Sequence, residues 1–312
     1  MSSRIWQPAA SLEAMKARAE LLSTVRAFFD ARGVLEVETP ALAAHGVTDP
    51  HIHCIEVPGY GWLQSSPEYH MKRLLAAGSG PIYQLSRVFR HGEAGPRHNP
   101  EFTMLEWYRP EFSLEQLIDE CLALLGRWLR RPNVIRPFRH LFAEVTGLDP
   151  LTCPPAALVA AAAEAGAPHG LDHRQSVDFL MATQVETALD PATLTVVTDF
   201  PAWAAALAQV REDEDGVPVA RRFEIYHGGL ELANGYQELT DAGEQARRFA
   251  ADNQERAGHG DRAMAPDPHL LAALQAGLPS CSGVAMGVER LLMAIHGYRD
   301  IRQVLTFPTQ RA

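Results

Sequence analysis

The sequence predicts an α+β fold in which helices pack on an antiparallel or mixed β-sheet. Two stretches, at 82–90 and 101–109, alternate like paired strands and are joined by a loop rich in glycine, histidine and arginine. Strand-like runs return at 194–198, 222–226 and 230–235. Between these two groups lies an alanine-rich stretch with helical patterns, which predicts a helical insertion at about 137–190.

The remaining elements follow from local start and stop signals. Ser11 is placed to cap a helix whose apolar residues recur at helical spacing as far as Phe29, and Gly33 ends it. Residues 34–38 form a predicted strand that Pro40 stops, and a second strand fits 52–57. Pro67 opens a helix to about residue 77. We expect further helices at about 113–131 and from about 241, then a strand and a helix within 282–296.

Composition narrows the class of protein. A chain of 312 residues that is 46% hydrophobic can bury a large core, and it has no apolar run long enough to span a membrane. Residues 1–10 lack the apolar run of a leader peptide. Four scattered cysteines favour reduced thiols and a cytoplasmic location. The formal charge of −10 weighs slightly against a long tRNA ligand, which would call for a basic surface.

The first chemical signal is Arg90 at the end of a strand, followed by a loop and a returning strand that carries Phe102. A guanidinium can clamp a phosphate and an aromatic ring can stack on a base, although an ordinary hairpin with surface arginines is equally compatible. Period-2 geometry puts Glu106 and Tyr108 on the face of Phe102. A carboxylate among apolar residues requires a partner, and a salt bridge to an internal arginine is the slightly favoured interpretation.

The second signal is a pair of carboxylates, Glu231 and Glu238, of the kind that Mg²⁺ uses together with phosphate oxygens. Seven residues apart on a regular strand they would face opposite ways, unless Asn234-Gly235 forms a bulge or turn. The third signal is a glycine-containing strand followed by Arg290 at the start of a helix. Taken alone, that motif favours a tightly packed strand–helix joint with a surface arginine.

The order of these segments resembles the class II aminoacyl-tRNA synthetases and, among them, the lysyl subgroup. Residues 28–40 resemble motif 1 at the dimer interface, 83–110 resemble motif 2, and 283–293 resemble motif 3. Ser66-Pro67-Glu68, residues 97–106 and residues 231–238 match the lysyl signature. The resemblance covers nearly the whole chain and implies a single catalytic domain over 1–312, with an antiparallel or mixed sheet flanked by helices, acting as a homodimer.

Lysyl-tRNA synthetases also carry an OB-fold that reads the anticodon. Only 27 residues precede Phe28, whereas five strands and their connections need at least about 45, so we expect no such domain. A freestanding lysyl-type domain containing residues 104–110 resembles the ligases that attach (R)-β-lysine to elongation factor P. The resemblance implies an ATP-dependent and Mg²⁺-dependent ligase that takes (R)-β-lysine or lysine and acylates a lysine of that factor. Two alternatives remain open, a minimal lysyl-tRNA synthetase and a non-catalytic regulator.

The resemblance also assigns roles by position. Arg90 would contact the α-phosphate and the attacking carboxylate, Arg290 would hold the far end of ATP, and Phe102 would stack on adenine. The other implied ATP-binding residues are His91, Gly92, Glu93, His98, Asn99, Glu231, Leu232 and Gly287. The implied amino-acid-binding residues are Ser66, Pro67, Glu68, Glu106, Tyr108, Asn234, Glu238 and Ala285. The implied Mg²⁺ ligands are Glu231 and Glu238.

Two positions depart from the family pattern. Gly92 stands where motif 2 usually has a glutamate, so either Glu93 takes over the adenine contact or that contact is lost. Ala285 stands where lysyl-tRNA synthetases usually have glycine. The added methyl group should tighten the pocket wall and disfavour α-lysine relative to its β-isomer, by about 1–3 kcal/mol.

Overall fold

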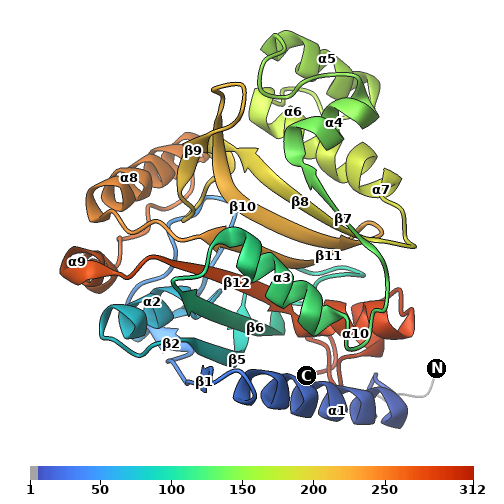
Figure 1. Ribbon diagram of the computed structural model, residues 1–312, viewed down its shortest axis with the longest axis vertical. Coiled ribbons are helices and arrows are strands. Elements are labelled where there is room, and N and C mark those ends of the chain that lie inside the picture. The colour runs from blue at the N-terminus through green and yellow to red at the C-terminus, as the bar shows by residue number, and fades with distance from the viewer. Residues whose placement is uncertain (1–5) are drawn as a thin grey trace. The chain divides into compact units, whose positions relative to one another are not determined.

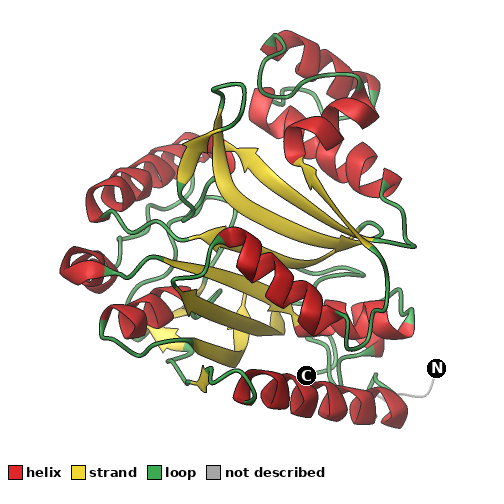
Figure 2. Cartoon of the chain, viewed as in Figure 1, coloured by secondary structure: helices red, strands yellow, loops and turns green. Residues whose placement is uncertain are grey.

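The computed structural model describes residues 6–312. The first five residues, part of the segment considered above as a leader peptide, lie outside the described residues. The chain divides into two compact units, of which the first joins residues 1–120 to 238–312 and the second holds 121–237. Each unit combines helices with strands (Figure 1, Figure 2), and the predicted α+β class is confirmed. That the whole chain forms a single catalytic domain stays a prediction.

The first unit contains a mixed sheet. Its strands run in the order β1 (Leu35–Glu36), β5 (Ile82–Phe89), β6 (Glu101–Pro110) and β12 (Cys281–Gly287). β1 is parallel to β5, whereas the β5–β6 and β6–β12 pairs are antiparallel. β5 and β6 lie where alternation predicted them. A second, antiparallel sheet contains β2 (Leu42–Ala43), β4 (Gly61–Leu63) and β3 (Ile55–Val57).

The helical segments of the first unit are α1 (Leu12–Asp30), α2 (Glu68–Ala76), α8 (Ala242–His259), α9 (Pro268–Gly277), α10 (Val288–His296) and the 3₁₀ turn η3 (Ile301–Gln303). Most of these segments begin at a residue whose side chain caps them, whereas α2 and α10 begin without a side-chain cap. The Ser11 side chain accepts from the Ala14 N–H at 3.2 Å, and Asp241 accepts from the Glu244 N–H at 2.7 Å. α3 (Leu114–Leu125) begins in this unit, and α9 was not among the predicted helices.

Aromatic packing fixes the end of α1 onto the sheet of the first unit. The Phe29 ring stacks on Tyr83 of β5 at 4.5 Å between centroids and meets Trp107 of β6 edge-on at 5.3 Å. Trp107 is fully buried, and its indole N–H donates to Glu120 Oε2 at 3.1 Å. The pair of strands that carries the predicted nucleotide and amino-acid residues therefore rests on a rigid core.

Two predicted strands are shorter than expected. The strand expected at 52–57 forms only as Ile55–Val57, because Asp49 starts a turn that takes up the residues before it. The Ile52 N–H donates to the Asp49 carbonyl at 3.2 Å, and the His51 N–H donates to the Asp49 side chain at 2.8 Å. The strand expected at 34–38 forms ladder pairs only at Leu35–Glu36.

The second unit has a sheet of its own strands. Their order is β11 (Leu230–Gln237), β10 (Pro218–His227), β8 (Leu194–Pro201) and β7 (Asn133–Pro137), with β9 (Val210–Glu212) pairing beside β10. β7 is parallel to β8, and the other pairs are antiparallel. β7 was not predicted from the sequence.

The helices of the second unit occupy the range predicted for the insertion. They are α4 (Phe138–Thr146), α5 (Pro155–Glu164), α6 (His173–Leu180), the π-turn η1 (Met181–Val185) and α7 (Glu186–Ala188), followed later by the 3₁₀ turn η2 (Ala202–Ala204). Their apolar faces share one core with β8 and β10, in which Phe142, Leu180 and Val197 are fully buried.

Candidate active site

The buried carboxylate of Glu106 lies on β6 within a set of hydroxyl groups. Glu106 is only 2% exposed. Ser66 Oγ donates to one carboxylate oxygen at 2.8 Å, and the Tyr108 hydroxyl donates to the other at 2.7 Å. Within the part of the chain that the structure describes, no arginine forms an ion pair with Glu106, so the arginine partner favoured by the sequence is wrong. Two neutral donors take its place.

Helix α2 adds a second carboxylate and a cation. Pro67 precedes the helix and places Glu68 in its first turn, where the Glu68 N–H donates to Ser66 Oγ at 3.0 Å. One turn later, Lys72 Nζ lies 2.7 Å from Glu68 Oε1 and 2.6 Å from Glu238 Oε2. The sequence analysis missed Lys72. Its spacing from Glu68, four residues within one helix, was the signal that could have found it.

A glycine brings the remaining members of the site together. Gly283 of β12 lies opposite Tyr108 in the ladder. A Cβ atom at Gly283 would lie 2.3 Å from Tyr108 Cε1 and 2.5 Å from Glu238 Oε1, distances that real Cβ atoms essentially never show. The absence of a side chain therefore lets the tyrosine ring and the glutamate approach each other. Ala285, two residues on, lies opposite Glu106.

We call this group the carboxylate site. Its members are Ser66, Glu68, Lys72, Glu106, Tyr108 and Glu238. Burial, together with the charge of Glu68, raises the pKa of Glu106 to about 8, although the hydrogen bonds from Tyr108 and Ser66 lower it. Burial also raises the pKa of Glu238 to about 7, although Lys72 opposes the shift. A ligand with ammonium groups favours the ionised form of these carboxyl groups, and once all three are ionised the single ammonium of Lys72 leaves two formal negative charges, so the site is suited to a ligand with two ammonium groups.

The predicted phosphate-binding arginines both lie at the loop between β5 and β6, since Arg90 begins the loop and Arg290 of α10 contacts it. The guanidinium of Arg90 lies 5.3 Å from the Phe102 ring centroid and 3.6 Å from Glu93 Oε1. Arg290 Nη2 lies 2.7 Å from His98 Nε2, a contact in which His98 accepts. The loop between β5 and β6 thus links both arginines to the predicted adenine-stacking ring.

Other predicted loop residues form hydrogen bonds with backbone groups or set the backbone conformation. The Asn99 side chain donates to the Glu101 carbonyl at 2.6 Å and accepts from the Thr309 N–H at 3.2 Å, which ties the loop to the C-terminal segment. The exposed His91 donates its N–H to the His53 carbonyl at 2.7 Å. Gly92 has a φ of 80°, a left-handed conformation that disfavours the glutamate usual there. Gly287 ends β12 with a φ of −76°, three residues before Arg290.

The other predicted residues belong to the second unit, on β11. Ile225 pairs with Ala233 but Tyr226 pairs with Glu231, so Leu232 is an extra residue in a β-bulge. The bulge lies at Leu232 and not at Asn234-Gly235, where the sequence analysis placed it. It removes the objection that glutamates seven residues apart must face opposite ways. Asn234 lies on the face of Tyr236, to whose hydroxyl its side chain donates at 3.3 Å.

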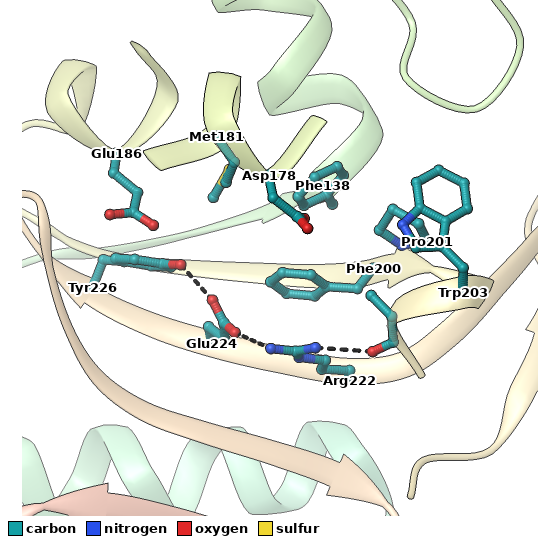
Figure 3. Close-up of a pocket in the computed structure, with 11 residues that line it drawn as sticks. Phe138, Asp178, Met181, Glu186, Phe200, Pro201, Trp203, Arg222, Glu224 and Tyr226 are labelled. Carbon is teal, nitrogen blue, oxygen red and sulfur yellow. Dashed lines mark hydrogen bonds and ion pairs between the residues drawn. The ribbon is translucent and has the colours of Figure 1, made fainter. Parts of the chain in front are cut away.

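The second unit also holds a cavity of about 190 Å³ that no predicted residue lines. Figure 3 shows its floor on β10, where Arg222 and Tyr226 both donate to Glu224. Arg222 also donates to the Ala204 carbonyl at 2.8 Å. Burial raises the pKa of Glu224, and the charge of Glu231 adds to the shift against Arg222. This network was not found from the sequence, where 222–226 was read only as a strand.

Among residues 6–312, no helix is both long and apolar enough to cross a bilayer. Over the same range, no group of three or more histidine, cysteine, aspartate or glutamate side chains is arranged to hold a metal ion.

The sheet with its flanking helices, the arginines Arg90 and Arg290 and the carboxylate site together define a synthetase-type catalytic chain. The family model of class II tRNA synthetases (D, K and N) matches residues 6–311, and the chain belongs to this family. It is 47% identical to the elongation factor P–(R)-beta-lysine ligases of Pasteurella multocida and Mannheimia succiniciproducens, over 98% of this chain and 98% of each relative. The ligase of the same name from Histophilus somni is 46% identical over 97% of both chains.

Proposed function

We propose that this chain is an ATP-dependent ligase that activates (R)-β-lysine or lysine and transfers it to a lysine side chain of elongation factor P. The carboxylate site carries the proposal, because its two uncompensated negative charges match an amino acid with two ammonium groups. The relatives named above supply the acceptor, since their names specify elongation factor P and (R)-beta-lysine.

The amino acid would bind through the carboxylate site. Glu106 is held by Ser66 and Tyr108, which fixes its oxygens before a ligand arrives. Glu68 and Glu238 present two further carboxylates beside it. Such prior arrangement lowers the entropic cost of holding the substrate in a reactive position. Ala285 lies opposite Glu106, so its methyl group is placed to bear on the shape of this pocket.

The nucleotide would bind along the loop between β5 and β6. Phe102 offers a ring face, and Arg90 and Arg290 offer guanidinium groups that pair with phosphate oxygens. The amino-acid carboxylate attacks the α-phosphorus, the bond to the pyrophosphate oxygen breaks, and an aminoacyl-adenylate forms. The acceptor amine then attacks the carbonyl carbon, loses a proton and releases AMP. Arg90 would neutralise charge that develops at the α-phosphate.

The residues present suit magnesium. Carboxylate oxygens are hard ligands, and Mg²⁺ commonly binds through one or two carboxylates plus phosphate oxygens. By the resemblance, Glu231 and Glu238 would supply those oxygens, and Lys72 contacts Oε2 of Glu238. The ion would offset phosphate charge as pyrophosphate leaves. A pair of protein carboxylates completed by phosphate oxygens would not require a larger cluster of protein ligands.

The homodimer implied by motif 1 is also part of the proposal. β1 ends the strand order of the first unit, and Leu35 on it is 57% exposed. An open cavity of about 410 Å³ lies beside it, lined by residues of α1, β1 and Tyr83. Exposed apolar surface at a strand edge favours an association of copies. The four cysteines, all free thiols, support the proposed cytoplasmic location.

One incubation tests the proposed function against its alternatives. The purified chain is given ATP, Mg²⁺ and either lysine or (R)-β-lysine, with elongation factor P and lysine tRNA offered together as acceptors. Intact mass is read for both acceptors. We expect a mass gain on the factor alone, larger with the β-isomer. Charging of the tRNA instead would make the chain a minimal synthetase, and labelling of neither acceptor would favour a regulator.

A further inference from the structure

Lys72 is a buried cation at the centre of the carboxylate site. The chain has only two lysines, Lys16 and Lys72, among 28 basic side chains. Lys16 is exposed on α1, whereas the Lys72 side chain is 1% exposed. An ammonium taken out of water is costly unless it is paired and hydrogen-bonded. Lys72 meets that condition through Glu68 and Glu238, which come from α2 and from the residue after β11.

The contacts around Lys72 extend in two directions through the carboxylate site. On one side, Glu68 connects through its backbone N–H to Ser66, which donates to Glu106, which accepts from Tyr108. On the other side, Glu238 lies beside the Tyr108 ring in the space left by Gly283. The full set in order is Lys72, Glu68, Ser66, Glu106, Tyr108, Gly283 and Glu238. A change at Lys72 therefore reaches both ends of the amino-acid site.

Packing alone does not require a lysine at this position. The aliphatic stem could be matched by methionine, and replacing a buried ion pair with apolar side chains is often neutral or stabilising. The lysine adds a positive charge that orients two carboxylates. Its ammonium draws one oxygen of Glu68 and one of Glu238 to a common point, at 2.7 and 2.6 Å. It also offsets one of the three carboxylates that line the site.

We propose that Lys72 is a positioning residue for amino-acid recognition. Its ammonium holds Glu68 and Glu238 in the orientations that receive a diammonium substrate, and it limits the site to two uncompensated negative charges. Lys72 contacts protein carboxylates and acts through them. This inference rests on the proposed function, because it names how that same site selects its amino acid.

Steady-state kinetics of ATP–pyrophosphate exchange test the role. The variants are Lys72→Met, which removes the charge at similar length, and Lys72→Arg, which keeps it, with Lys16→Met as the matched control. We expect Lys72→Met to raise KM for the amino acid by about tenfold or more, as for the loss of one charged contact, and to raise KM for ATP less, because of its two partners only Glu238 is also a proposed Mg²⁺ ligand. Lys72→Arg should recover part of the loss, and Lys16→Met should match the wild type.

A spectroscopic measurement on the unmutated chain keeps the inference testable if Lys72→Met fails to fold. Lysine labelled with ¹⁵N at Nζ gives two signals in this chain, one from each lysine. The buried Lys72 ammonium should exchange its protons slowly, and its signal should shift when (R)-β-lysine or lysine saturates the site. The Lys16 signal should not move.

The outcomes separate this inference from the proposed function. If the wild type exchanges pyrophosphate with no diammonium amino acid, the proposed function fails and this inference fails with it. If the wild type is active but Lys72→Met keeps its amino-acid KM, only the role of Lys72 is overturned. A Lys72 signal that stays in place at saturating amino acid would overturn it as well. Lower thermal stability with unchanged KM would assign Lys72 a structural role alone.

Discussion

Adding a single methyl group at Gly283 should disrupt amino-acid binding more than any change of equal size nearby. The new Cβ would lie 2.3 and 2.4 Å from two carbons of the Tyr108 ring and 2.5 Å from Glu238 Oε1. Neither neighbour can swing away easily, because Tyr108 is 2% exposed and Glu238 is 1% exposed. The ring or the carboxylate must move, and both belong to the carboxylate site.

The size of the effect follows from overpacking. Inserting a methyl group into a filled core costs about 1–3 kcal/mol in the free energy of unfolding. If a similar displacement is imposed on the bound amino acid, KM for that substrate rises by about tenfold to a hundredfold. Urea denaturation measures the first quantity, and ATP–pyrophosphate exchange at varied amino acid and varied ATP measures the second. We expect KM for ATP to rise less than KM for the amino acid, because Tyr108 and Glu238 both belong to the amino-acid site and only Glu238 is also a proposed Mg²⁺ ligand.

Gly287→Ala is the matched control for Gly283→Ala. It makes the same change on the same strand, and its nearest neighbours would be atoms of the Arg290 side chain at 3.7–3.8 Å, an ordinary contact. The two variants should therefore differ in both stability and amino-acid KM. If Gly283→Ala were as stable as Gly287→Ala and kept the wild-type KM for the amino acid, the close packing of this site would be refuted.

The remaining predictions concern charge, pocket shape and assembly. The pKa of Glu106 is about 8 in the free site, and a diammonium amino acid favours the ionised carboxylate. As the pH is raised toward 8, the affinity of the site for that amino acid should therefore rise about tenfold per pH unit, and above pH 8 it should level off. Calorimetric titration at pH 6–9 checks this, and a flat profile would contradict it. Ala285→Gly should shift the preference from (R)-β-lysine toward α-lysine by roughly tenfold in kcat/KM, and an unchanged ratio would disprove the role of the methyl group. Leu35→Glu should weaken the proposed homodimer, seen by sedimentation as a shift toward monomer, because a carboxylate replaces exposed apolar surface at the strand edge. Sedimentation identical to the wild type would exclude that edge from the interface.

Much of the fold could be predicted because its signals are local. Alternation along β5 and β6 gave both strands nearly to the residue, since side chains on a strand face opposite ways in turn. Ser11 and Asp241 marked the starts of α1 and α8 because their side chains satisfy free N–H groups there. β7 was missed because it is only five residues long, ends at Pro137 directly before α4, and shows no clear alternation of apolar and polar residues.

Only the parts of the site that lie on one strand could be predicted from the sequence. The shared face of Glu106 and Tyr108 follows from period-2 geometry, and the structure connects them directly. Lys72 was missed although its spacing from Glu68 is a local signal, and its contact with Glu238 could not be assigned because that partner is distant in sequence. The bulge at Leu232 depends on how β11 pairs with β10, which the sequence of one strand does not determine.

The enclosure of Lys72 has a chemical consequence for selectivity among amines. An activated amino acid is an electrophile, and any neutral amine within reach of its carbonyl carbon is a competing acceptor. Lys72 is buried, and although burial favours the neutral amine, Glu238 and Glu68 outweigh that effect and raise its pKa. It stays protonated and so has no lone pair for attack. The lysine side chain built into the proposed amino-acid site is thereby protected from the acylation that the enzyme directs at another protein.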